Sequence, residues 1–245
     1  MRQFSDEHLA ALAVLIVTTV ASVWTARRHP GRVTDTFARA LAVLILAGWI
    51  GEYVADVVNG IWTVKYDLPL QLTDAVSATA VLALWTRRAL LVELVYFWAL
   101  TASLQATVTP DLAQTFPSIY YFTYFDYHVG AVIGGCMLVF GCRQYPRPHA
   151  AWRAFAATLA FAALAAAGDL ITGGNYLYLR SKPQHNSLLS VFGPWPWYIV
   201  GAALVGLAML LVLQWIADRV RRWDRPGIAP ESAARPTGYG TERYP

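Results

Sequence analysis

The stretch Leu68-Pro69-Leu70-Gln71-Leu72-Thr73-Asp74-Ala75 begins an apolar helix behind a proline and carries three polar side chains in its first turns. Ionisable and amide side chains are costly inside a lipid bilayer, so they persist there only where they face protein, water or a substrate. Gln71, Thr73 and Asp74 therefore indicate a polar site at one end of a membrane helix.

The rest of the chain is unusually apolar. Charged residues make up 14% of it, whereas soluble domains carry about 25%. The apolar residues form blocks near the ~20 residues that cross a bilayer, at 8–26, 37–58, 69–86, 89–108, 118–141, 151–172 and 196–217. We predict an all-α polytopic bundle of about seven transmembrane helices in residues 1–222. Residues 223–245, rich in Pro and Gly, are expected to form a disordered cytoplasmic tail.

The basic residues predict the orientation of this bundle. Lys and Arg accumulate in cytoplasmic loops, and with seven spans 15 of the 19 basic residues fall on one side, leaving Arg2, Lys65, Arg180 and Lys182 on the other. We therefore expect the amino terminus outside and the carboxyl terminus inside. Tryptophans near the predicted ends are typical of an aromatic belt, at Trp24, Trp49, Trp62, Trp85, Trp195 and Trp197.

The net charge and the cysteine content limit the kinds of partner, metal and cofactor that we expect. The net charge of +4 comes largely from arginines beside apolar blocks, where they set orientation and bind anionic headgroups. We expect contacts with membrane lipids, no nucleic-acid partner, and a multi-pass location in the cell (plasma) membrane. Cys136 and Cys142 lack the neighbours of a metal site, and no cofactor motif is visible, so we expect neither metal nor cofactor.

Polar residues collect at the predicted outer ends of five helices and in the loop beyond the sixth. They are Glu52, Asp56 and Asn59; Gln71, Thr73 and Asp74; Gln105, Thr109 and Asp111; Asp126 and His128; and Asp169 and Asn175. Glu93 is the main exception, with Arg87 and Arg88 as expected partners. The 172–197 segment is too long for a plain connection, and we expect it to fold back as a lid over an outward-facing polar cavity.

Two of these residues suggest nucleophilic catalysis. A hydroxyl such as that of Thr73 attacks an ester only when a base removes its proton, and a histidine oriented by a carboxylate is a suitable base. His128 would be that base, oriented by Asp126 or Asp169. In the structural alternative, Thr73 and His128 only satisfy buried hydrogen bonds between helices.

Several motifs, in order, resemble the YwaF-like family of bacterial integral membrane proteins. They are Leu68 to Ala75, Leu104-Gln-Ala-Thr-Val-Thr-Pro-Asp-Leu112, Phe116-Pro117, Phe125-Asp-Tyr-His128, Gly174-Asn-Tyr-Leu177, Ser181-Lys-Pro183 and Gly193-Pro-Trp-Pro-Trp-Tyr198. The resemblance implies a remote relation to a eukaryotic transmembrane phospholipid acyltransferase and to the androgen-induced membrane lipid hydrolases. Gln71 and Thr73 stand where YwaF-like proteins commonly carry His and Cys.

These observations support a membrane-embedded lipid acyl hydrolase or acyltransferase as the leading hypothesis. Its expected catalytic residues are Thr73, His128, Asp126 and Asp169, and its expected substrate-binding residues are Gln71, Asp74, Gln105, Asn175 and Glu52. A transporter or ion-coupled permease is the first alternative, because intramembrane carboxylates can carry protons or cations. A non-catalytic membrane protein that binds a lipid or a partner is the second.

Overall fold

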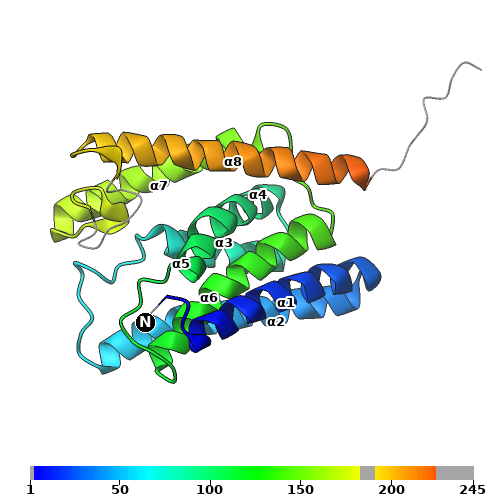
Figure 1. Cartoon of the computed structure of the whole chain (residues 1–245), viewed down its shortest axis with the longest axis horizontal. Helices are drawn as coiled ribbons and strands as arrows, with labels where there is room; N and C mark the ends of the chain where they lie inside the picture. Colours follow the sequence, from blue (N-terminus) through cyan, green and yellow to red (C-terminus); the bar gives the residue numbers. More distant parts are fainter. Residues whose placement is uncertain (1–2, 183–190, 225–245) are drawn as a thin grey trace, which may run out of the picture.

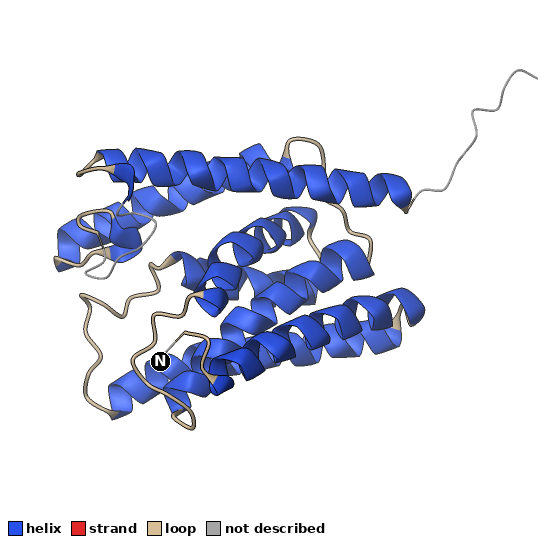
Figure 2. Ribbon diagram, viewed as in Figure 1, coloured by secondary structure: helices blue, strands red, loops and turns tan. Residues whose placement is uncertain are grey.

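The computed structural model describes residues 3–182 and 191–224, and within these ranges the chain forms seven helices and no strand (Figures 1 and 2). The first three are α1 (Asp6–Arg28), α2 (Arg32–Val58) and α3 (Leu72–Thr86). The fourth joins α4 (Ala89–Trp98), the π-helical turn η1 (Ala99–Ser103) and α5 (Leu104–Val108). The fifth joins α6 (Ile119–Cys136) to the π-helical turn η2 (Met137–Gly141). They are followed by α7 (Ala150–Thr172), the 3-10 turn η3 (Tyr176–Tyr178) and α8 (Trp197–Trp223).

The expected helical membrane bundle is confirmed. Six helices are long and apolar enough to cross a bilayer, and their positions follow the predicted blocks closely. The largest difference at a span end is in α8, which continues to Trp223 instead of ending near 217. Apolar side chains on its exposed surface, such as Leu204, Val212 and Trp215, would contact lipid. The predicted tail lies almost entirely outside the described residues.

α3 is the exception among the seven. It has 15 residues, a length of roughly 22 Å, which is shorter than the ~30 Å hydrocarbon core. The predicted span 69–86 therefore starts too early, because the backbone from Pro69 to Gln71 is not helical. Irregular backbone at membrane depth is tolerated only where protein or a water-filled cavity satisfies its polar groups.

The loop after α7 provides some of the hydrogen bonds that this irregular backbone needs. The Leu68 N–H donates to the Tyr176 hydroxyl at 2.9 Å, and this hydroxyl donates to the Val64 carbonyl at 2.8 Å. The Leu177 N–H donates to Gln71 Oε1 at 3.1 Å. The described part of the 172–197 segment thus turns back onto residues 64–71, while 183–190 lie outside the described residues.

α6 lies at the centre of the bundle. In its most apolar 18-residue window 89% of the residues are buried, against 6% in α8. Gly130 lets Ile45 of α2 approach, and Gly134 does the same for Leu84 of α3, so these two glycines, four residues apart, form a close-packing surface. In Figure 1, α1 and α2 cover one side of this centre, and α7 and α8 lie together on the opposite side.

The arginines gather at one end of the bundle, as the alternation of spans predicts. Arg27 of α1 binds Asp224, which follows α8, with a shortest distance of 2.7 Å, and it also donates to the Phe140 carbonyl. Arg87, after α3, binds Asp35 of α2 at 2.8 Å. These contacts join the ends of five helices into what we call the arginine-rich end. That this end faces the cytoplasm stays a prediction.

Glu93 does not have the predicted partners. Its carboxylate is 2% exposed and binds Arg147 at 2.8 Å and Arg153 at 2.9 Å, with the Arg147 N–H as a further donor at 3.0 Å. Arg87 points instead to Asp35. The expectation failed because it used closeness along the chain, whereas the loop before α7 brings Arg147 to α4 and the first turn of α7 brings Arg153 there.

Candidate functional site

A small polar cavity lies where α2 meets the beginning of α3. Its volume is about 110 Å³. One face of α2 contributes at spacings of three and four residues, which places those side chains on a single side of the helix. We call it the α2–α3 cavity, and its lining is Trp49, Glu52, Tyr53, Asp56, Tyr66, Asp67, Leu68, Gln71, Thr73, Asp74 and Tyr127.

Asp74 holds this region together. Its Oδ1 accepts from Trp49 Nε1 at 2.9 Å and from the Tyr53 hydroxyl at 2.8 Å, and its Oδ2 accepts from the Gln71 N–H at 2.9 Å. The last bond satisfies one of the backbone donors that every helix start leaves unpaired. Trp49 was predicted to lie in the aromatic belt. Its indole N–H donates to Asp74, and its place in the belt stays a prediction.

The cavity carries other carboxylates besides Asp74. Glu52 lies within hydrogen-bonding reach of the Tyr127 hydroxyl, and Asp56 and Asp67 complete the acidic lining. No Lys or Arg is among the described lining residues. The electrostatic character of the cavity therefore favours a cationic or neutral group over an anionic one.

Thr73 lines the cavity beside these carboxylates. Its carbonyl accepts a hydrogen bond from the Ser77 hydroxyl at 2.9 Å. By contrast, the hydroxyls of Thr86, Thr101 and Thr158 donate back to carbonyls of their own helices. No such bond ties the Thr73 hydroxyl within the described residues, so it is available to a molecule in the cavity.

His128 lies deeper and outside the cavity lining. It is 2% exposed, and its ring packs against Tyr124 and Tyr127 with centroids 4.5 and 4.4 Å apart. α3 and α6 run in the same direction, with Leu84 against Gly134. Counting back along each helix at 1.5 Å per residue places His128 roughly 7 Å below Thr73 along the bundle axis. His128 Nδ1 is buried and has no partner among the described residues.

The two carboxylates expected to orient His128 lie elsewhere. Asp126 packs against Gly48 of α2; residues two apart on a helix point about 200° apart, so Asp126 faces away from His128. Asp169 is 1% exposed and accepts from the Tyr176 N–H at 2.6 Å, which closes the turn after α7.

Of the other residues that the sequence predicted for the site, some line the cavity and some lie elsewhere. Glu52 and Gln71 join Thr73 and Asp74 in the cavity. Gln105 is exposed on α5, and Asn175 is occupied within its own loop, where it bonds Arg180 and Ser181. In the described ranges, no three His, Cys, Asp or Glu side chains are grouped to hold a metal ion.

A comparison with family models matches residues 3–214 to the TMEM164 family. The chain belongs to this family. The matched range contains the α2–α3 cavity and all seven helices apart from the last residues of α8. The family assignment and the apolar helices together make it a multi-pass membrane protein. No curated protein and no solved structure matches the chain.

Sequence reasoning missed Tyr53, Tyr66, Asp67 and Tyr127 as parts of the cavity in this TMEM164-family chain. The signal for Tyr53 was present, because Trp49, Glu52, Tyr53 and Asp56 follow the spacing of one helix face. Tyr127 gave no such signal, since it lies in a run of aromatic residues on a helix that is buried almost all round.

Proposed function

We propose that this protein is a membrane-embedded lipid acyl hydrolase or acyltransferase of the cell membrane, and that Thr73 is its nucleophile. The observation that carries the proposal is the position of Thr73, which lines a polar cavity with Glu52 and Asp74 and whose hydroxyl has no hydrogen-bond partner among the described residues. The resemblance to YwaF-like proteins, and through them to lipid acyltransferases and hydrolases, favours the same chemistry.

The reaction follows from what surrounds Thr73. Its Oγ attacks the carbonyl carbon of a lipid ester while a base takes the hydroxyl proton. The tetrahedral oxyanion then collapses, the bond to the lipid alcohol breaks, and that oxygen takes the proton. Water releases the acyl group from Thr73 in a hydrolase, and the hydroxyl of a second lipid accepts it in an acyltransferase.

We assign the base to Glu52, because it lines the same cavity as Thr73, whereas His128 lies roughly 7 Å deeper. His128 then acts as a positioning residue through Tyr127, whose ring it contacts and whose hydroxyl faces Glu52. The amide N–H₂ of Gln71 is the donor that could reach an oxyanion, since its Oε1 is already bound by the Leu177 N–H.

The test is acyl-ester turnover by the purified full-length protein with labelled phospholipid. Thr73→Ala should abolish turnover without unfolding the bundle, and Thr73→Ser should retain part of it. Thr86→Ala is the matched control, because Thr86 lies on the same helix at the arginine-rich end and bonds its own backbone. Full turnover in Thr73→Ala would eliminate the mechanism.

The base is tested separately. Removing a general base typically costs about 10²–10⁴-fold, and Glu52→Gln keeps the size of the side chain. The loss of turnover in Glu52→Gln should therefore fall in this range, and combining this substitution with Thr73→Ala should cause no further loss. His128→Ala should lose less, and Tyr127→Phe should resemble it. If His128→Ala abolished turnover while Glu52→Gln retained it, the base would be His128, as the sequence predicted.

A second candidate is binding or transport of a cation or proton, favoured by the four carboxylates of the cavity and the lack of a described basic lining residue. In that case Glu52→Gln would remove cation-dependent stabilisation or flux in liposomes. Thr73→Ala would leave both unchanged. The two variants therefore distinguish the candidates.

A further inference from the structure

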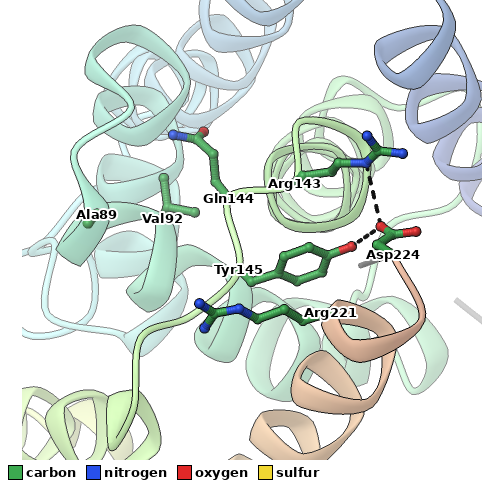
Figure 3. A pocket seen from close by; sticks show the side chains of 7 residues that line it. All are labelled: Ala89, Val92, Arg143, Gln144, Tyr145, Arg221 and Asp224. Carbon is green, nitrogen blue, oxygen red and sulfur yellow. Dashed lines mark hydrogen bonds and ion pairs between the residues drawn. The ribbon is translucent and has the colours of Figure 1, made fainter. Parts of the chain in front are cut away.

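α8 packs mainly against α7, and hydrogen bonds attach it to the rest of the bundle. Near its middle, the Leu213 carbonyl accepts from the Tyr96 hydroxyl of α4 at 2.9 Å. At the arginine-rich end, Asp224 accepts from Arg27 of α1 and from the Tyr145 hydroxyl. Figure 3 shows the bond to Tyr145 beside a cavity of about 360 Å³. These bonds fix the position of α8 relative to α1 and α4.

The first turn of α8 makes another hydrogen bond, to residues 173–182, which we call the strap. Tyr198 is 2% exposed, and its hydroxyl donates to the Tyr178 carbonyl at 2.6 Å. On the other side, Asp169 of α7 accepts from the Tyr176 N–H at 2.6 Å. The strap is therefore held by both α7 and α8.

The backbone of the strap is unusual between these two contacts. Leu177 and Tyr178 have φ angles of 54° and 55°, in the left-handed region. Two consecutive residues other than glycine rarely adopt this conformation, because their Cβ atoms crowd the backbone. It persists only where the surroundings hold it, and the bond from Tyr198 is one such contact. In this conformation the Leu177 N–H donates to Gln71 Oε1 at 3.1 Å.

The bond from Leu177 determines how the Gln71 amide is turned. A backbone N–H can bind only the oxygen of a side-chain amide, so Oε1 lies at the strap and the N–H₂ group points elsewhere. Gln71 lines the α2–α3 cavity with Thr73, and its N–H₂ donates to no described residue. Without the bond from Leu177, the amide could turn its oxygen into the cavity, where it would repel a developing oxyanion.

We propose that Tyr198 and the Leu177 N–H are positioning groups that hold the Gln71 amide with its N–H₂ directed into the α2–α3 cavity. The inference rests on the proposed function, in which this N–H₂ stabilises the oxyanion formed at Thr73. Neither Tyr198 nor Leu177 lines the cavity. Tyr198 acts on the reaction only through the strap and Gln71.

The first experiment measures hydrogen–deuterium exchange of the Leu177 amide in the full-length protein in detergent, by mass spectrometry with electron-transfer fragmentation. Gln71→Ala removes the acceptor, and Tyr198→Phe removes the bond that holds the strap. Each should speed exchange about fivefold, the ratio that corresponds to the ~1 kcal/mol of a typical hydrogen bond. Tyr145→Phe is the matched control, because it removes a hydroxyl bond at the opposite end of α8. It should leave exchange at Leu177 unchanged.

The second experiment measures acyl-ester turnover with labelled phospholipid. Gln71→Ala should lower kcat about 10²–10³-fold, the usual cost of losing one oxyanion donor. Tyr198→Phe should lower kcat about two- to fivefold and leave KM unchanged, because an oxyanion donor acts only in the transition state. Combined with Gln71→Ala, Tyr198→Phe should cause no further loss. Tyr145→Phe should keep the kcat and KM of the wild type.

Three results would overturn the proposal. Unchanged exchange at Leu177 in Gln71→Ala would show that the bond between them is absent. Equal acceleration in Tyr198→Phe and Tyr145→Phe would mean that α8 loosens as a whole. An equal loss of kcat from Tyr198→Phe with and without Gln71→Ala would show that Tyr198 acts independently of Gln71. If the wild type has no turnover but exchange changes as expected, the proposed function fails while the positioning of Gln71 stands.

Discussion

The Glu93 cluster allows a quantitative prediction for Glu93→Gln. Five hydrogen bonds reach the carboxylate, from the Arg147 N–H and from two nitrogens each of the Arg147 and Arg153 guanidinium groups, at 2.8 to 3.1 Å. The carboxylate is 2% exposed, but the arginine side chains are 52% and 36% exposed. After the substitution the guanidinium groups can return partly to water.

The expected cost of Glu93→Gln is therefore about 3 kcal/mol, at the lower end of the range for breaking a buried ion pair. Asp35→Asn is the matched comparison, since in its ion pair with Arg87 the side chains are 49% and 29% exposed, far more than the Glu93 carboxylate, and the pair should contribute less than about 1 kcal/mol. For a domain of this size, ~3 kcal/mol lowers the melting temperature by roughly 6–12 °C.

The assay is thermal unfolding of both variants in the same detergent, followed by intrinsic fluorescence. The melting temperature of Glu93→Gln should fall well below that of Asp35→Asn. Similar values for the two variants would refute the reasoning, because burial of the carboxylate would then have no energetic consequence.

Two further variants test the packing and the arginine-rich end. A Cβ on Gly48 would collide with the Asp126 carboxylate, so Gly48→Ala should lower the free energy of unfolding by about 1–3 kcal/mol. Gly206→Ala is the control, because a Cβ there meets open space and should cost no stability. Equal melting temperatures of the two variants would contradict this prediction. Asp224, bonded by Tyr145, has a lowered pKa, so its contribution to stability is present above its usual pKa near 4 and is lost as the pH falls below that value. The difference in melting temperature between wild type and Asp224→Asn should accordingly be constant from about pH 7 to pH 5 and shrink below about pH 4; a difference that grew in acid would contradict the sign.

The sequence was sufficient to predict the helices because the requirement for a membrane span is local. Each segment must be apolar and must satisfy its own backbone, so the blocks could be recognised one at a time. The alternation of basic residues then predicted correctly which helix ends lie together. The same reasoning placed α3 only approximately, since the non-helical backbone before it is held by contacts that the local sequence does not reveal: the Leu68 N–H donates to the Tyr176 hydroxyl and the Gln71 side chain accepts from the Leu177 N–H, each more than 100 residues away.

The site was less predictable, because it depends on the rotation of each helix. Depth along the chain correctly grouped Glu52, Gln71, Thr73 and Asp74. It could not reveal that His128 turns toward Tyr124 and Tyr127, because a helix buried almost all round has no polar side that fixes its rotation. Glu93 found partners across the bundle for a similar reason, since proximity in space was decided by how the loop before α7 folds.

The short α3 explains why these polar groups occur together at all. A helix that stops before the membrane surface leaves backbone donors and acceptors that lipid cannot satisfy, so Asp74 and Gln71 are needed there whatever the protein does. Asp74 meets this need with bonds from Trp49, Tyr53 and the Gln71 backbone. Among the described residues, the Thr73 hydroxyl satisfies none of these backbone groups. Its replacement should therefore change chemistry without loosening the fold, whereas replacement of Asp74 should loosen the fold whether or not the protein is an enzyme.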